Sequence, residues 1–256
     1  MRYHKGYIAL SDTYDVPVIL HIRNARAVYF EQLCELLSFD GFRASSRSNR
    51  WRVARIEKAG LIARFAGLRH LSKPVFGITQ SGLAFLESRG HYLLSLPSTT
   101  ERILHPFQVP HALELVSIRL ALAAAGLLRS WKCELEITSR NLVFENAATK
   151  DFDAIAEIEA EGGPRSIAIE YERSLKAAFR YQAIREILNK DRTADMVLYL
   201  AASDDILYLL ASELSSSRKR MAFAMSEAFR HSLLDTRMLT NTQTSEVVLF
   251  RELLSD

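Results

Sequence analysis

Apolar residues in the first hundred positions recur mostly at the helical period of about 3.6 residues, and in two short stretches they cluster as they do in strands. Serine and threonine caps and a glycine stop mark where the helices begin and end. The pattern predicts, in chain order, a helix at 27–37, a helix between a Ser45 or Ser46 cap and Gly60, strands at 61–65 and 75–78, and a helix at 79–89. An apolar segment at 16–22 is expected to form an additional strand or arm.

Beyond residue 110 the pattern changes to longer apolar runs, as expected for strands buried inside a sheet. Gly162-Gly163-Pro164 predicts a hairpin turn between two of these strands. Helices are expected at 111–128, 175–188, 204–214 and 219–234, and strands at 131–137, 150–159, 166–171, 196–201 and 247–250. This order predicts an α+β protein whose second part is an α/β domain with a mixed sheet flanked by helices.

The stretch 92–110 contains three prolines and reads as a connection between two domains, which we place at 1–100 and 101–256. Charge separates the same two parts. The first hundred residues hold 14 Lys+Arg against 7 Asp+Glu, whereas the remainder holds 19 against 23. A net charge of +7 in one domain and −4 in the other predicts that the first domain contacts a polyanion.

A cationic helix in the first domain carries the clearest chemical signal. An apolar stripe is expected at Trp51, Val53, Ala54, Ile56 and Leu61. A short basic hairpin follows this helix, an order typical of a winged helix-turn-helix domain bound to double-stranded DNA. The predicted contacts are Arg47, Asn49, Arg50 and Arg52 near the major groove, and Arg55, Lys58, Arg69 and Lys73 at phosphates. The alternatives are a solvated charged face and a module that docks a protein partner.

Acidic residues gather in the second domain on both sides of the predicted hairpin turn. Asp153 lies on the first strand, and Glu170 and Glu172 share one face of the second, because strand side chains alternate. Such carboxylates could hold Mg²⁺ or Mn²⁺, with Asp153 and Glu170 as ligands and Glu114 as a further oxygen donor. Lys176 could then stabilise developing charge. The structural alternative is a hairpin with a solvent-facing acidic side.

The segments F-D-A-I-A-E-I at 152–158 and A-I-E-Y-E-R-S-L-K at 168–176 resemble the motifs of the PD-(D/E)XK nuclease fold. Two positions depart from that pattern: Glu172 stands where the motif has lysine, and Phe152 stands where it has proline. With the preceding winged helix and H-A-L-E-L at 111–115, the chain resembles the replication-relaxation family of bacterial plasmids and other mobile elements.

This resemblance implies a DNA-binding protein that acts in replication, mobilisation or transcription control, with a catalytically inactive nuclease-like domain. The alternative that it leaves open is a metal-dependent DNA endonuclease directed by the winged helix. Asp153, Glu170, Glu172 and Lys176 would then be the catalytic residues, and Mg²⁺ or Mn²⁺ would be required.

Other chemistry finds little support in the chain. Cys34 and Cys133 are expected to be separate thiols, because no C-x-x-C spacing accompanies them. We find no Ser-His-Asp order, phosphate-binding glycine loop or dinucleotide fingerprint. The N-terminus lacks an apolar signal core and no run is long enough to cross a bilayer, so a cytoplasmic protein is expected. Homodimerisation through apolar helices at 206–214 and 221–234 is possible, although burial within one chain is the simpler explanation.

Overall fold

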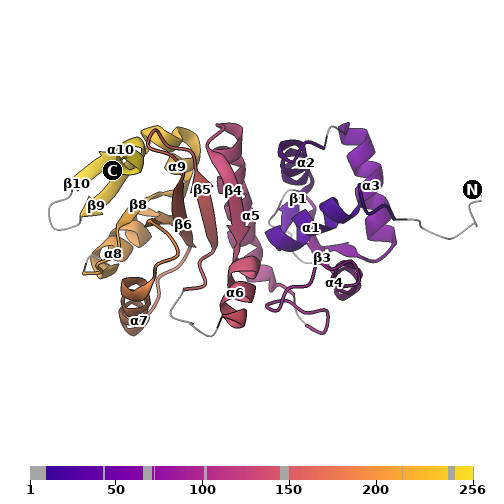
Figure 1. The fold of residues 1–256 in the computed structure, drawn as a ribbon, viewed down its shortest axis with the longest axis horizontal. Coiled ribbons are helices and arrows are strands. Elements are labelled where there is room, and N and C mark those ends of the chain that lie inside the picture. The colour runs from indigo at the N-terminus through magenta and orange to yellow at the C-terminus, as the bar shows by residue number, and fades with distance from the viewer. Residues whose placement is uncertain are drawn as a thin grey trace, which may run out of the picture. The chain divides into compact units, whose positions relative to one another are not determined.

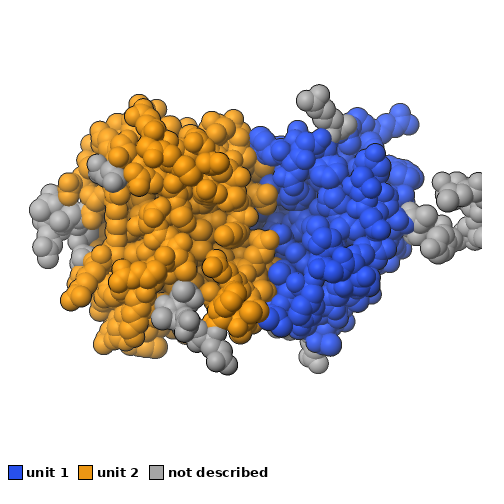
Figure 2. Space-filling view, in the orientation of Figure 1, with its two compact units in different colours: residues 1–116 blue, residues 117–256 orange. Residues whose placement is uncertain are grey.

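The computed structural model describes residues 10–42, 44–65, 71, 73–100, 103–144, 150–214, 216–241 and 246–255. The chain is α+β and divides into two compact units, 1–116 and 117–256 (Figure 2). Unit 1 contains a small sheet and unit 2 a seven-stranded sheet (Figure 1). We expected the division near residue 100, and the units meet instead within one helix, α5 (Val109–Ala124).

Unit 1 consists of helices and a small three-stranded sheet that precede α5 in the chain. Its elements are α1 (Val16–Ala25), β1 (Val28–Tyr29), α2 (Phe30–Phe39), α3 (Ser46–Lys58), β2 (Ile62–Arg64), β3 (Val75–Ile78), α4 (Gln80–Glu87) and a short 3-10 helix (Pro106–Gln108). Strand β3 lies in the middle of the sheet and pairs antiparallel with β1 and with β2. The sheet therefore joins the chain before α2 to the chain after α3.

The segment that we expected to be a strand or arm is the helix α1. Its β-branched residues favour strands, but Val18, Ile19 and Ile22 are spaced for one face of a helix and are almost fully buried. Pro17 stands in the first turn, where the missing N–H costs nothing. The predicted helix at 27–37 is also shifted, because residues 28–29 pair with β3 and α2 starts at Phe30.

Unit 2 is a mixed sheet with helices packed on it. Its elements are β4 (Leu128–Cys133), α6 (Glu134–Val143), β5 (Ala154–Ile158), β6 (Arg165–Glu172), α7 (Ala178–Lys190), β7 (Met196–Ala201), α8 (Asp204–Leu214), β8 (Met221–Met225), α9 (Ser226–Ser232), a 3-10 helix (Leu233–Asp235), β9 (Arg237–Asn241), β10 (Glu246–Leu249) and α10 (Phe250–Ser255). The strand order is β10-β9-β8-β7-β6-β5-β4. Only the central pairs, β6 with β7 and β7 with β8, are parallel.

Two predictions in this unit were wrong. The expected strand at 131–137 ends at Cys133, because Glu136 caps a new helix by accepting the backbone N–H of Cys133 at 2.9 Å. The expected helix at 219–234 is strand β8 followed by α9. Its Met and Ala residues favour helices, but four of the five β8 residues are buried within the sheet, where tertiary packing outweighs propensity.

The core of unit 2 lies between the sheet and the helices α7 and α8. Tyr199 of β7 and Phe223 of β8 stack there at 5.6 Å. Ile206, Leu210 and Leu214 of α8 are buried in this core. The sequence left a dimer surface on this helix open and gave burial within one chain as the simpler explanation, and these side chains are buried inside the unit. None of the helices in the described part of the chain is long and apolar enough to cross a membrane.

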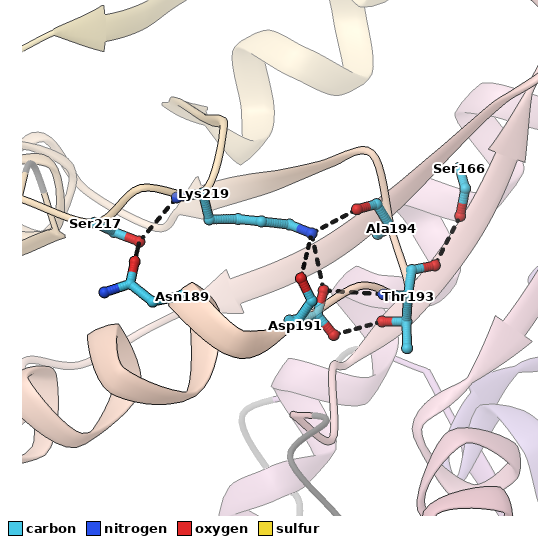
Figure 3. Close-up of polar contacts among 7 residues, drawn as sticks. All are labelled: Ser166, Asn189, Asp191, Thr193, Ala194, Ser217 and Lys219. Carbon is cyan, nitrogen blue, oxygen red and sulfur yellow. Dashed lines mark hydrogen bonds and ion pairs between the residues drawn. The ribbon is translucent and has the colours of Figure 1, made fainter. Parts of the chain in front are cut away.

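A buried ion pair ties together two connections at one end of the unit 2 sheet (Figure 3). The Lys219 ammonium donates to Asp191 Oδ2 at 2.9 Å and to the Ala194 carbonyl at 2.5 Å. Thr193 donates its hydroxyl to Asp191 Oδ1 at 2.7 Å. The Asp191 side chain is fully buried. Its charge is therefore balanced by one lysine that comes from the connection between α8 and β8.

Candidate functional site

The two ends of α3 are defined by the residues that the sequence indicated. The Ser45 hydroxyl accepts the backbone N–H of Ser48 at 3.2 Å, which satisfies one of the open donors of the first turn. Just past the last turn, Gly60 has φ +75°, the left-handed conformation that glycine adopts at least cost. Both predicted boundaries of the helix are confirmed.

The buried face of α3 differs from the predicted apolar stripe. Asn49, Val53 and Ile56 are buried, and they are four and three residues apart on one helix face. The Asn49 amide lies 3.6 Å from the Cys34 sulfur. Trp51 is 63% exposed and Ala54 is also exposed, so neither packs as expected. Asn49 therefore belongs to the interior of unit 1, where its side chain cannot reach a base.

Two of the predicted DNA-contacting arginines are held by one buried carboxylate. Asp15, at the start of α1, is fully buried and forms an ion pair with the Arg55 guanidinium. The Arg52 Nε lies 3.5 Å from the other oxygen of the same carboxylate. Arg52 also stacks over the Tyr14 ring at 5.3 Å. These contacts fasten α3 to α1, so Arg52 and Arg55 have a structural role.

The opposite face of α3 presents cations to the surface. Arg47, Arg50 and Lys58 are exposed there around Trp51. The Arg50 guanidinium lies 5.2 Å from the centre of the Phe30 ring. Lys73, just before β3, is exposed and 3.6 Å from Glu31. The structure thus brings four of the eight predicted DNA contacts to the surface of unit 1.

The remaining predicted contact, Arg69, lies outside the described residues.

In unit 2 the structure brings the predicted acidic residues together. The backbone N–H of Asp153 donates to Glu170 Oε1 at 3.3 Å, and Asp153 Oδ2 accepts the backbone N–H of Tyr171 at 2.8 Å. Glu170 and Glu172 are 5% and 7% exposed, on the face of β6 that continues into the α7 and α8 core. The alternative of a solvent-facing acidic hairpin is wrong for these two glutamates.

A lysine neutralises each of the two buried glutamates. Lys150 forms an ion pair with Glu170, and Lys176 forms one with Glu172. Burial raises the pKa of Glu170, although the charge of Lys150 opposes this shift. Burial also lowers the pKa of Lys176, against the nearby charge of Glu170. The apolar surroundings therefore favour the neutral forms of Glu170 and Lys176, and the nearby opposite charges favour the charged forms.

Lys150 and Tyr199 were not identified from the sequence as parts of this cluster. Tyr199 is the β7 partner of Glu170, and burial raises its pKa well above the ordinary value. Its buried hydroxyl has no hydrogen-bond partner within the described residues. A phenol within an otherwise apolar run, 196–201, was the signal available for Tyr199. The position of Lys150, three residues before Asp153, was the corresponding signal for that lysine.

The residues that the sequence offered as ligands of a divalent cation are Asp153 and Glu170, with Glu114 as a further oxygen donor. In the part of the chain that the structure describes, no three His, Cys, Asp or Glu side chains are grouped to hold a metal ion. Each buried glutamate instead faces an ammonium group, which takes up the charge that a cation would otherwise balance. The further oxygen donor that we expected, Glu114, is half-buried on α5 within unit 1.

No family model, no curated protein and no solved structure matches the chain.

Proposed function

We propose that the chain binds double-stranded DNA through the exposed face of α3. The observation that carries this proposal is the division of α3 into two faces. Asn49, Val53 and Ile56 pack inside unit 1, whereas Arg47, Arg50 and Lys58 extend outward. One face of α3 is packed inside unit 1, so the helix can present the row of cations on its other face to phosphates and to base edges in the major groove.

We infer further that unit 1 is a winged helix. Three helices, α1 to α3, precede a two-stranded hairpin, and the short β1 completes its sheet. In a helix-turn-helix arrangement the later helix enters the major groove, and its N-terminal residues meet the bases. Arg47 and Arg50 lie in the first part of α3, so we assign them to base edges, and Lys58 and Lys73 to phosphates.

The contacts proposed here are fewer than the sequence suggested. Asn49 is buried, and Arg52 and Arg55 are engaged with Asp15, so we leave these three out of the interface. Arg47 and Arg50 can each pair with guanine through two hydrogen bonds. Specificity in this proposal therefore depends on arginine, without a contribution from the asparagine amide.

Gel-shift titration of full-length variants tests the interface. Arg47→Ala and Arg50→Ala should each weaken binding of the preferred duplex by about 1–3 kcal/mol. Arg192→Ala, an exposed arginine in unit 2, is the matched control and should bind as the unaltered protein does. Equal affinity for all three variants would refute the assignment of α3 as the DNA-contacting element.

We propose that unit 2 is nuclease-like in its motifs but not catalytic. The ion pairs of Lys150 with Glu170 and of Lys176 with Glu172 support this view, because they neutralise the carboxylates that would hold metal. The alternative endonuclease makes a definite prediction. Supercoiled plasmid incubated with the protein and Mn²⁺ or Mg²⁺ should be nicked, and Asp153→Ala should abolish the nicking.

The biological setting follows from the motif resemblance and is likewise a proposal. A DNA-binding unit followed by a nuclease-like unit suits a protein that acts at DNA sites in plasmid replication, mobilisation or transcription control. Selection of bound sequences from a random duplex pool would test it. Enrichment of one sequence supports a site-directed role, whereas no enrichment would leave only sequence-independent binding.

A further inference from the structure

A groove runs along α3 on the side that faces the small sheet of unit 1. It has a volume of about 480 Å³, within the range of about 300–1,000 Å³ that is common for small-ligand sites. Arg50, Ala54 and Glu57, spaced four and three residues apart, line it along the helix. The other walls come from the start of α2, from β2 and from the chain that leads into β3.

Aromatic rings form much of the groove wall. Phe30, Trp51 and Phe76 contribute from three different elements. A guanidinium group lies over each of these rings. Arg50 lies 5.2 Å from the Phe30 ring centre, Arg55 lies 4.6 Å from that of Trp51, and Arg64 lies 5.6 Å from that of Phe76. Aromatic and guanidinium planes are the surfaces on which proteins stack unpaired nucleic-acid bases.

The charges in the groove favour an anionic ligand. Its two carboxylates already face cations, since Arg64 Nε lies 2.9 Å from Glu57 and Lys73 lies 3.6 Å from Glu31. Arg50 is the third cation of the lining, and its guanidinium lies over the Phe30 ring. Three cations against two carboxylates leave one net positive charge, which matches one phosphate.

We infer that this groove takes an unpaired nucleotide of a DNA strand, with its base among the aromatic rings and its phosphate near Arg50. The inference rests on the proposed function, because Arg50 belongs both to the groove and to the proposed DNA-contacting face. A base can enter such a groove only after it leaves the helical stack, and bulged or mismatched bases do so at least cost. The chain therefore binds DNA with an extrahelical base more tightly than fully paired DNA.

Trp51 provides a direct measurement. The chain contains two tryptophans, so Trp131→Phe leaves Trp51 as the single indole fluorophore. In this background, a short duplex with one extrahelical adenine should quench the emission and bind about tenfold more tightly than the paired duplex. Trp51→Ala should bring the two affinities within about twofold of each other, and Trp51→Phe should retain most of the preference.

Tyr208→Ala is the matched control, because Tyr208 is 64% exposed in unit 2 and Trp51 is 63% exposed in unit 1. It should keep the full preference. Equal affinity and equal quenching with both duplexes would overturn the inference. Binding to the paired duplex would in that case still support the proposed function. Equal quenching by a free mononucleotide would also overturn the inference. If neither duplex binds at all, the proposed function fails as well.

Discussion

Gly82 shows how a single residue lets two elements of unit 1 approach each other. A side chain at this position would overlap the carbonyl oxygen of Leu61, just after α3, and would press on Ile78. The Thr79 hydroxyl accepts the backbone N–H of Gly82 at 3.0 Å and so caps the same turn. The absence of a side chain therefore sets the distance between the start of α4 and the end of α3.

Gly82→Ala should lower the free energy of unfolding by about 1–3 kcal/mol, because backbone must move to admit the methyl group. Chemical denaturation followed by circular dichroism measures the change. Gly162→Ala is the control, since a methyl group there would lie 3.6 Å from the flexible end of Arg165. Equal stability of the two variants would show that α4 can shift without cost.

The Lys219–Asp191 pair acts at the same scale in unit 2. Lys219→Ala would leave the fully buried Asp191 carboxylate without its counter-charge and should lower the free energy of unfolding by about 3–5 kcal/mol. Lys190→Ala removes an exposed lysine from the end of α7 and should change stability little. Thermal unfolding of both variants would separate these outcomes, and a matched midpoint would contradict the structural role.

At the scale of the element, α3 combines a structural face and a binding face. Arg55→Ala removes one of the two arginines that face the buried Asp15 carboxylate and should lower the free energy of unfolding by about 1.5–3 kcal/mol. Arg47→Ala lies on the exposed face and should leave stability within about 0.5 kcal/mol. Denaturant titrations of the two variants test this, and a loss of stability in Arg47→Ala would place that side chain among the structural contacts.

The ends of α3 and the turn between β5 and β6 were more predictable than the buried face of α3. Ser45, Gly60 and the turn at 162–164 act through local backbone chemistry, which neighbouring residues reveal. The buried face of α3 was misjudged because Trp51 is apolar but exposed, and Asn49 is polar but buried. Burial is decided by partners distant in sequence, such as Cys34 for Asn49, and periodicity does not identify them.

The same limit explains the acidic cluster in unit 2. Strand alternation and the hairpin turn indicated that Asp153 would lie beside Glu170, and the structure confirms it. The surroundings of Glu170 could not be predicted in the same way, because they depend on contacts that strand periodicity does not describe. Lys150 reaches Glu170 from the chain before β5, and Tyr199 is placed next to the same glutamate by the parallel pairing of β6 with β7.

At the scale of the whole molecule, the uneven distribution of charge predicts how DNA binding responds to salt. The first hundred residues carry 14 Lys+Arg against 7 Asp+Glu, so phosphate contacts should release counterions. The logarithm of the association constant should fall linearly with the logarithm of salt concentration, and Lys58→Ala should reduce that slope by about 1. Fluorescence anisotropy over a salt series measures it, with Arg192→Ala as control. An unchanged slope for Lys58→Ala would remove Lys58 from the phosphate contacts.

The role of Asp15 has a practical consequence for anyone who shortens the protein. The sequence pattern predicts the first helix of the DNA-binding domain only from residue 27, and a fragment cut there would omit α1 together with Asp15. Arg52 and Arg55 would then lose the carboxylate that orients them, and α3 would lose its anchor. Truncated versions should therefore begin upstream of Ser11, whose backbone N–H donates to Asp15 at 2.7 Å.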